Sequence, residues 1–352
     1  MAPSSHAPLR LGVLGCAQIA KQFVRDVAGS DAVIVAAAAS RNLAKAQDFC
    51  RSAGIHTAYG SYEALIADPR LDAIYIPLPN HLHAEWAIRS LEAGKHVLCE
   101  KPLALGHAQA QRMFDTARRH QRFLLEAYPY WFQPQTRDLL DRLHGRTGPG
   151  IGRIRSVQAS FGFTVGKPET NIRMKPEMGG GALLDAGSYP LSFIRLVMGC
   201  APQHVWAHAR WADTGVDISM MATLLYADGR SAQMSCAMDA ANHRRATVVG
   251  TQGTLETEYL NHTSISHTHP WGYLPSQMRM RAGIANSLAF EEIYSATGSG
   301  FRFAAEAFAQ VVRDNDVAAI ERAACASLDI AATLEAVAKS ARTGQAVKLA
   351  AT

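Results

Sequence analysis

The stretch 9-LRLGVLGCAQIA-20 joins an apolar run to a segment with helical spacing, with only a tight turn between them. The run over residues 9–15 is mostly apolar, as expected of a strand inside a sheet. Residues 18–27 place apolar side chains three to four positions apart, which predicts a helix. A buried strand that leads straight into a helix opens a βαβ unit, so we expect an α/β domain with a parallel sheet.

The turn itself, 15-GCAQIA-20, has the register of the dinucleotide fingerprint G-x-G-x-x-G/A. Gly15, Ala17 and Ala20 occupy its three small positions, and Ala17 stands where a second glycine is usual. A phosphate group is favoured at such a helix N-terminus. A tight strand-to-helix turn without a ligand would have the same spacing, so the turn alone leaves both interpretations open.

Outward from this turn, strands and helices alternate as far as residue 127. The strand segments that follow are 32–39, 72–76, 96–99 and 123–127. The helical segments between them are 43–53, 61–67, 81–93 and 106–120. Apolar strands separated by helices indicate a parallel sheet covered on both sides. We predict a doubly wound α/β dinucleotide-binding domain of the Rossmann type over residues 1–127.

Beyond a loop rich in glycine, at 145–152, strands follow one another directly. The predicted strands are 154–163, 203–211, 217–226, 231–238, 245–250 and 253–258. Turn residues such as 227-ADG-229 separate them, which favours antiparallel pairing. Helices are expected at 181–197, 301–313 and 327–341. This order predicts an α+β domain with an open, mostly antiparallel sheet, and we assign residues 128–352 to substrate binding and dimerisation.

The composition disfavours several classes of protein. The chain has 352 residues, 48% hydrophobic and 18% charged, as in soluble globular proteins. No apolar run approaches the ~20 residues of a membrane span, and the first residues, MAPSSHAPLR, lack the apolar core of a signal peptide. The formal charge of +5 comes without a Lys/Arg block, which disfavours nucleic acid as a partner. Six scattered cysteines without disulfide or metal spacing fit a reducing cytoplasm.

The end of the second predicted strand, 36-AAAASRN-42, indicates which dinucleotide is bound. An acidic residue there would bind the ribose hydroxyls of NAD, and this segment has none. Ser40 offers a hydroxyl and Arg41 a cationic fork, which suit the 2′-phosphate of NADP. The alternative is a solvated Arg41 at the start of a helix. We predict NADP as the cofactor.

Two charges stand at the end of a predicted buried strand in 97-VLCEKPLAL-105. A buried charge is costly unless it is paired or solvated. Ligands of open α/β sheets bind beyond the carboxyl ends of the strands, so we expect Glu100 and Lys101 to face a cleft rather than the core. A surface ion pair at a strand end is the alternative.

A second polar group follows a glycine run in 179-GGGALLDAGSYP-190. Asp185 and Tyr189 are four residues apart and would share one face of a helix. Pro190 cannot donate a backbone hydrogen bond and biases Tyr189 away from helical geometry, so a kink or a late helix start is expected. Tyr189 is then either a proton-transfer group or a core aromatic residue.

Five segments together resemble one family. They are 15-GCAQIA-20, 39-ASR-41, 75-YIPLPNHLH-83, 94-GKHVLCEKP-102 and 179-GGGALLDAGSYP-190. Over about residues 9–349 the chain is similar to the glucose–fructose oxidoreductase/inositol dehydrogenase (Gfo/Idh/MocA) family. Within it, the chain most resembles the NADP-using sugar dehydrogenases and dihydrodiol dehydrogenases, whereas members resembling inositol dehydrogenase have histidine in place of Tyr189.

The resemblance implies roles for the residues in these segments. Lys101 is implied as a substrate-site cation near the nicotinamide, Glu100 as a neighbour of the nicotinamide ribose, and the Lys101–Pro102 peptide as cis. Tyr189 is implied as the catalytic acid/base, with Asp185 orienting the substrate or Tyr189. The implied cofactor contacts are Gly15, Ala17, Gln18, Ile19, Ser40, Arg41, Pro77, Leu78, Asn80, His83, Glu100 and Lys101.

Histidines and aromatic residues give weaker signals. His81 and His83 have a metal-like spacing, but a helix start that faces a cleft explains them without metal. The segment 262-HTSISHTH-269 is expected to be a polar loop, and we predict no metal. Trp131, Phe132 and residues 128–130 follow the last strand of the first domain, where either a cleft wall or a core between domains is expected.

We therefore expect an NADP-dependent dehydrogenase or reductase that moves a hydride between nicotinamide and a hydroxyl/carbonyl group of a small sugar or polyol, such as the aldopyranoses D-xylose and D-glucose. A trans-dihydrodiol dehydrogenase or ketone reductase of the same family is one alternative, and a non-catalytic NADP-binding regulator is another. The open sheet needs a cover on one face, so we expect a homodimer or a dimer of dimers, joined sheet to sheet.

Overall fold

The computed structural model describes residues 7–259, 277–285 and 287–350. The chain forms two compact units. The first comprises Met1–Pro129 and Ser299–Ser327, and the second comprises Tyr130–Gly298 and Leu328–Thr352. The first unit is therefore built from two separate parts of the chain. The domain boundary at residue 127, and the roles assigned on either side of it, stay predictions.

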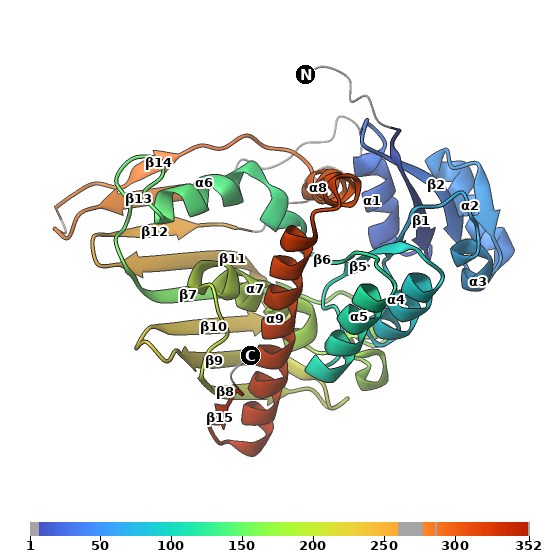
Figure 1. Cartoon of the computed structure of the whole chain (residues 1–352). Helices are drawn as coiled ribbons and strands as arrows, with labels where there is room; N and C mark the ends of the chain where they lie inside the picture. Colours follow the sequence, from blue (N-terminus) through green and yellow to red (C-terminus); the bar gives the residue numbers. More distant parts are fainter. Residues whose placement is uncertain (1–6, 260–276, 286, 351–352) are drawn as a thin grey trace. The chain divides into compact units, whose positions relative to one another are not determined.

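Within the described residues, the first unit contains a six-stranded parallel sheet with the order β3-β2-β1-β4-β5-β6 (Figure 1). The strands are β1 (Leu9–Leu14), β2 (Val33–Ala39), β3 (Thr57–Tyr59), β4 (Ala73–Ile76), β5 (His96–Glu100) and β6 (Leu124–Ala127). The order runs outward from β1 in two directions, so the predicted doubly wound sheet is confirmed. The edge strand β3 is half-buried and too short to give a sequence pattern.

Helices cover this sheet. Every residue of β4 and of β6 is buried, which requires cover on both faces. The helices between the strands are α1 (Gln18–Val27), α2 (Leu43–Ala53), α3 (Tyr62–Ile66), α4 (His83–Glu92) and α5 (His107–Arg119). The later helix α8 (Gly300–Asp314) also belongs to this unit, because Ser299, which caps its N-terminus, donates a hydrogen bond from Oγ to Asp26 Oδ2 at 2.8 Å.

The described part of the second unit contains a nine-stranded sheet with the order β14-β13-β12-β11-β7-β10-β9-β8-β15. Its strands are β7 (Ile154–Thr164), β8 (His204–Trp211), β9 (Asp217–Leu225), β10 (Ser231–Ala237), β11 (Asp239–Gly250), β12 (Gly253–Thr257), β13 (Met278–Ala282), β14 (Glu291–Ile293) and β15 (Val347–Lys348). β7 and β10 pair in parallel, and the other neighbours are antiparallel. The predicted mostly antiparallel sheet is confirmed, and β13, β14 and β15 extend it at its edges.

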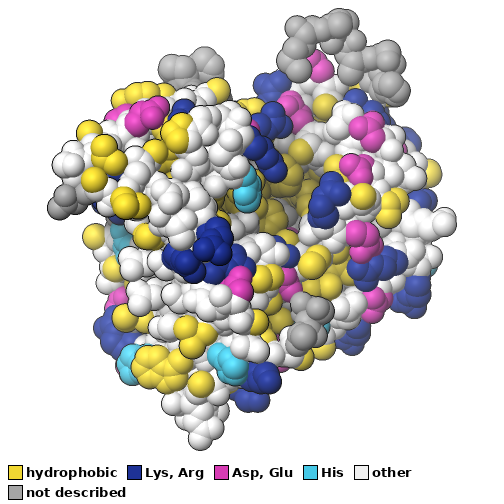
Figure 2. All heavy atoms as spheres, turned by 60° about the vertical axis from the view of Figure 1, so that its left-hand side comes forward, with side chains coloured by type: hydrophobic (Ala, Val, Ile, Leu, Met, Phe, Trp, Pro, Cys, Tyr) yellow, Lys and Arg dark blue, Asp and Glu magenta, His cyan; other side chains and the backbone are white. Residues whose placement is uncertain are grey.

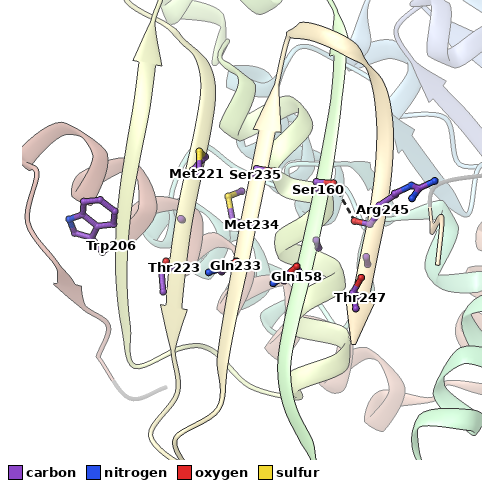
Figure 3. A pocket seen from close by; sticks show the side chains of 13 residues that line it. Gln158, Ser160, Trp206, Met221, Thr223, Gln233, Met234, Ser235, Arg245 and Thr247 are labelled. Atoms are coloured by element: carbon purple, nitrogen blue, oxygen red, sulfur yellow. Dashed lines mark hydrogen bonds between the residues drawn. The ribbon is translucent and has the colours of Figure 1, made fainter. Parts of the chain in front are cut away.

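Helices lie on one face of the second sheet (Figure 1). α7 (Ser188–Met198) packs on β7 and β10. The part of α9 (Val317–Thr343) in this unit contacts β8, where Ala207 N donates a hydrogen bond to Ser340 Oγ at 2.9 Å. α6 (Pro134–Leu143) belongs to the same unit. On the opposite face, side chains of β7 to β11 lie open (Figure 3).

The surface is mixed in character. Figure 2 shows one face of the molecule, on which Lys and Arg side chains form several separate groups with polar and hydrophobic surface between them. Among the helices of the described ranges, none combines the length and the apolar character that a membrane crossing needs.

Candidate active site

The turn after β1 requires glycine at its first position. Gly15 has a φ of +122°, and a Cβ atom there would lie 2.9 Å from Leu78 Cδ2. Ala17 is the extended N-cap residue of α1, and no side chain in the described ranges caps this helix. The first backbone N–H groups of α1 are therefore open to a ligand, preferably an anion. Gln18 is exposed beside them, and Ile19 is half-buried.

Ser40 and Arg41 follow directly on the carboxyl end of β2. Ser40 is buried, and its Oγ accepts a hydrogen bond from Asn42 N at 3.3 Å. Arg41 is exposed, and its charge acts on the hydroxyl of Tyr62, a buried residue of α3. Burial raises the pKa of Tyr62, and the charge of Arg41 opposes that rise. Sequence reasoning missed Tyr62 because α3 comes beside this strand end only in the fold.

His83 begins α4 and is fully buried. Its Nδ1 lies 2.8 Å from Pro102 O, and its Nε2 lies 2.7 Å from Leu78 O. The ring therefore joins the loop after β4, which contains Pro77, to the loop after β5, which contains Lys101. Burial lowers the pKa of His83. Because its side chain has no exposed surface, His83 can act on a bound cofactor only through these two loops.

The two charges of residues 97–105 differ in their surroundings. Glu100 is the last residue of β5 and is buried, and its Oε1 accepts a hydrogen bond from Tyr75 Oη at 2.6 Å. Glu100 is thus satisfied inside the first unit, rather than solvated. Lys101 is half-buried, and the Lys101–Pro102 peptide is cis, as the resemblance implies.

The predicted cofactor residues gather at one edge of the first sheet. The turn after β1, the end of β2 and the loops after β4 and β5 all follow the carboxyl ends of parallel strands, where ligands of this fold bind. Of the residues in the loop after β4, Pro77 is buried, whereas Leu78 and Asn80 are half-buried.

In the second unit, the glycine run 179–181 permits close packing of the backbone. Gly181 N donates a hydrogen bond to Arg173 O at 2.9 Å, and a Cβ atom at Gly180 would overlap the same oxygen. Gly181 has a φ of +113°, and a Cβ atom there would overlap Asp217 Oδ1. The run therefore lets the preceding loop lie directly against the start of the next helix.

Asp185 and Tyr189 lie on either side of a change in helix type. Asp185 is in the π-helical turn Leu183–Gly187, and Tyr189 is in the first turn of α7. The wide turn accommodates Pro190, which cannot donate to the preceding turn. The late start of the α-helix is as expected from the sequence. Both Asp185 and Tyr189 are half-buried.

Arg173 brings a third functional group to this place. Its Nε lies 2.5 Å from Asp185 Oδ2, and its Cζ lies 5.7 Å from the ring centroid of Phe163. The charge of Asp185 raises the pKa of Arg173, and Tyr189 adds to the rise. Tyr189 packs edge-on against Phe161, with 5.3 Å between ring centroids. Sequence reasoning missed Arg173, whose only signal is its place shortly before the glycine run.

The aromatic residues after β6 divide into two groups. Tyr128 and Tyr130 are fully buried, whereas Trp131 and Phe132 are half-buried. Tyr130 Oη accepts a hydrogen bond from Trp131 Nε1 at 2.8 Å and lies 2.7 Å from Ser192 Oγ. Tyr128 and Tyr130 are therefore core residues, and Trp131 and Phe132 keep some surface for contact with a ligand.

Histidine is the commonest metal ligand among side chains, so the histidines are the first candidates for a metal site. Among residues 7–259, 277–285 and 287–350, no group of three or more His, Cys, Asp and Glu side chains could hold a metal ion. Both ring nitrogens of His83 face carbonyl oxygens. The segment 262–269 lies outside the described residues.

Known protein families match both parts of the chain. Residues 9–128 match the oxidoreductase family with an NAD-binding Rossmann fold. Residues 149–256 match the GFO/IDH/MocA C-terminal domain.

Individual relatives match over most or all of their length. D-xylose 1-dehydrogenase (NADP(+)) 2 of Haloferax volcanii is 33% identical over 342 residues, which cover 97% of this chain and 100% of the relative. Trans-1,2-dihydrobenzene-1,2-diol dehydrogenase of Xenopus tropicalis is 36% identical over 70% of this chain and 74% of the relative. The crystal structure of KijD10, a 3-ketoreductase from Actinomadura kijaniata in complex with NADP and TDP-benzene, is similar with a TM-score of 0.83 and 32% identity, over 95% of this chain and 98% of KijD10.

Proposed function

The chain belongs to the Gfo/Idh/MocA family of oxidoreductases, and we propose that it is an NADP-dependent dehydrogenase or reductase that acts on CH–OH groups. It transfers a hydride between nicotinamide and a hydroxyl/carbonyl carbon of a small sugar or polyol, with D-xylose and D-glucose as the representative aldopyranoses. The observation that carries the proposal is that Asp185, Tyr189 and Arg173 come together at one helix start. The same chain matches 100% of the length of an NADP-dependent xylose dehydrogenase.

NADP fits the first unit. Gly15 permits the tight turn, with φ of +122°, that leads into the uncapped N-terminus of α1, where a phosphate is favoured. The end of β2 has a cation in place of an acid. Ser40 and Arg41 bind the 2′-phosphate, and Glu100 and Lys101 flank the nicotinamide end. The cofactor would accept the hydride as NADP⁺ when the substrate is oxidised and would supply it as NADPH when the substrate is reduced, at the nicotinamide C4 atom. The further contacts that we propose are Ala17, Gln18, Ile19, Pro77, Leu78 and Asn80, with His83 acting through the loops that it joins.

The hydroxyl proton passes through Tyr189. When the substrate is oxidised, its carbon loses a hydride and its hydroxyl proton goes to the Tyr189 phenolate; in the reduction the phenol returns that proton to the oxygen. A free tyrosine has a pKa of ~10, so the phenolate needs a nearby cation near neutral pH. We assign that role to Lys101. Asp185 orients the substrate hydroxyl, and Trp131 and Phe132 suit the apolar face of a sugar ring.

A dihydrodiol or a ketone is the second candidate substrate. The identity to trans-1,2-dihydrobenzene-1,2-diol dehydrogenase and the structural similarity to a 3-ketoreductase both favour it. A non-catalytic NADP-binding regulator would have no need for proton-transfer residues. The presence of Lys101, Asp185 and Tyr189 together therefore favours an enzyme.

A substrate screen tests the proposal. The purified protein is mixed with NADP or NAD and a panel of aldoses, inositols and diols, and with NADPH and a panel of ketones, while the absorbance of the reduced cofactor is followed. We expect turnover with NADP and an aldose. Turnover with diols or ketones alone would move the assignment to the second candidate. Binding of NADP without turnover of any compound would contradict the enzyme and favour the regulator.

We also propose that two copies pair through the open face of the second sheet. Trp206 is 53% exposed there and Met221 is 65% exposed, and both line a shallow pocket of about 400 Å³ (Figure 3). Large apolar side chains on an open sheet face call for a cover. Light scattering at micromolar concentration should give the mass of a dimer or a dimer of dimers, and Met221→Glu should lower it. A monomer of the unsubstituted chain would contradict this assembly.

We propose a separate role for each part of the chain and a compartment for the enzyme. Residues 1–127 bind the cofactor, residues 128–352 bind the substrate and the second copy, and the enzyme works in the cytoplasm. The six cysteines are free thiols, which is the state that a reducing compartment maintains.

A further inference from the structure

We propose that Arg173 is a positioning residue of the active centre. It fixes the Asp185 carboxylate in its charged form, and it gives the second unit a cation of its own at the helix start that contains Asp185 and Tyr189. This inference rests on the proposed function, because it concerns how Asp185 and Tyr189 are prepared for proton transfer and substrate orientation.

The contact between Arg173 and Asp185 is a close ion pair. Nε of Arg173 lies 2.5 Å from Oδ2 of Asp185. The Asp185 side chain is 17% exposed, so it is largely removed from the water that would otherwise solvate its charge. A carboxylate in such surroundings needs a charged hydrogen-bond donor, and the directed N–H of the guanidinium holds one carboxylate oxygen in place and favours the charged form.

Arg173 is itself held in place by the fold. Its backbone N donates a hydrogen bond to Asn171 Oδ1 at 3.0 Å, and its carbonyl oxygen accepts one from Gly181 N at 2.9 Å. The absence of a side chain at Gly180 is what allows this carbonyl to come so close. The glycine run of the sequence therefore brings the loop that contains Arg173 against the helix start that contains Asp185.

The charges of the three groups explain why a cation is needed here. A carboxylate near a phenol opposes formation of the phenolate. Arg173 Nε lies 2.5 Å from Asp185 Oδ2, and Asp185 comes four residues before Tyr189 at the same helix start. Both Asp185 and Tyr189 raise the pKa of Arg173, in keeping with this arrangement. Arg173 offsets the negative charge of Asp185, and Tyr189 can then lose its proton without facing an uncompensated carboxylate.

Arg173→Gln tests the inference in the full-length enzyme. We expect turnover to fall by about 10- to 100-fold, the range for loss of a charge-assisted hydrogen bond, with little change in NADP affinity. Arg173→Lys, which keeps the charge, should recover part of the loss, and added guanidinium should partly rescue Arg173→Ala. The matched control is Arg146→Gln, because Arg146 pairs with Asp141 in the same unit and neither belongs to the site. Turnover of Arg173→Gln equal to that of the control would overturn the inference.

A double-mutant cycle separates positioning from direct substrate contact. If Arg173 acts through Asp185, Arg173→Gln should lower the turnover of an Asp185→Asn enzyme by less than about threefold, because the interaction is already gone. Full additivity of the two losses would show that Arg173 acts independently of Asp185, and would overturn the inference.

A spectroscopic measurement distinguishes failure of the inference about Arg173 from failure of the proposed function. In 1H–15N spectra, the Nε–H signal of Arg173 should be protected from exchange in the unsubstituted protein and should lose that protection in Asp185→Asn. A protected signal in an enzyme whose turnover is insensitive to Arg173→Gln would overturn the inference alone. Absence of turnover by the unsubstituted protein with every substrate of the screen would overturn the proposed function as well.

Discussion

The two units hold their candidate site residues by different means. In the first unit the candidate site consists largely of backbone, at the turn of Gly15 and the open start of α1. The buried His83 joins two of its loops, and the buried Glu100 bonds Tyr75 of the neighbouring strand. In the second unit the candidate site consists of side chains, the half-buried Asp185 and Tyr189. A shape made of backbone suits a cofactor common to many enzymes, whereas side chains can be exchanged as the substrate changes.

The largest expected effect tests whether the second unit affects catalysis without affecting cofactor binding. Tyr189→Phe should lower turnover by roughly 10²–10⁴-fold, because general acid/base catalysis is lost. NADP affinity, measured by titration of protein fluorescence, should change little, since the proposed cofactor residues belong to the first unit. Near-normal turnover of Tyr189→Phe with the best substrate would remove Tyr189 from the mechanism.

Lys101 makes the comparison sharper, because it belongs to the first unit and is assigned to the same proton transfer. Lys101→Ala should lower turnover by a similar factor, roughly 10²–10⁴-fold. The double variant should be hardly slower than either single variant, because parts of one catalytic device are not additive. If the fall in turnover of the double variant equals the product of the falls in the two single variants, Lys101 and Tyr189 act independently.

The next effect is a pH dependence of stability that comes from a buried carboxyl group in the first unit. Glu126 is 2% exposed, its Oε1 accepts a hydrogen bond from Leu103 N at 2.9 Å, and burial raises its pKa to about 7. The folded state therefore keeps a proton that the unfolded chain releases near pH 4.5. This stabilising contribution is fully present below about pH 4.5 and is lost as the pH rises to about 7, a total of about 3 kcal/mol.

Glu126→Gln should remove that pH dependence. The thermal midpoint of the unsubstituted protein should fall relative to that of Glu126→Gln between about pH 5 and pH 8, in the direction given by the linkage. Glu92→Gln is the control, because Glu92 is an exposed residue of α4. Parallel midpoints for Glu126→Gln and the unsubstituted protein across this range would show that burial of Glu126 does not set the stability of the first unit.

Local patterns in the sequence predicted most of the fold. The strand and helix segments of residues 9–127 are confirmed because buried strands are continuous apolar runs and amphipathic helices have a strong periodicity. β3 and β15 have three and two residues, too few for any period to appear. Helix α8 was predicted as a helix, but its place in the first unit depends on long-range contacts such as that of Ser299 with Asp26.

The candidate site was less accessible from the sequence, for the same physical reason. Gly15, Lys101 and Tyr189 lie in recognisable motifs. Arg173 and Tyr62 act through contacts with residues distant in the chain, and neither has a motif of its own. A motif also says nothing of burial, so His83 has the spacing of a ligand-binding residue although both of its ring nitrogens face carbonyl oxygens inside the unit.

A smaller effect is expected where the first unit does use an exposed side chain. Arg41→Ala should weaken NADP binding by about 1.5–3 kcal/mol, because a charge-assisted contact with the 2′-phosphate is lost. NAD lacks that phosphate, so its affinity should hardly change. Dissociation constants for NADP and NAD, measured by calorimetry, test whether Arg41 recognises the 2′-phosphate. Equal losses for NADP and NAD would remove Arg41 from 2′-phosphate recognition.

The smallest effect is expected from Tyr62→Phe, which tests whether a buried side chain of the first unit positions even its exposed cation. The Tyr62 hydroxyl interacts electrostatically with Arg41, and we expect a weak interaction of this kind beside an exposed side chain to contribute about 0.5–1.5 kcal/mol. NADP should therefore bind more weakly by roughly 2- to 10-fold, whereas NAD should bind as before. Tyr59→Phe is the matched control, because the Tyr59 hydroxyl donates to Asp68 Oδ2 at 2.8 Å and has no part in holding Arg41.

In an Arg41→Ala background, Tyr62→Phe should have no further effect on NADP affinity, since the group that Tyr62 positions is gone. A loss of NADP affinity that persists in that background would mean that Tyr62 contacts the cofactor directly, and the first unit would then resemble the second in binding its ligand with side chains.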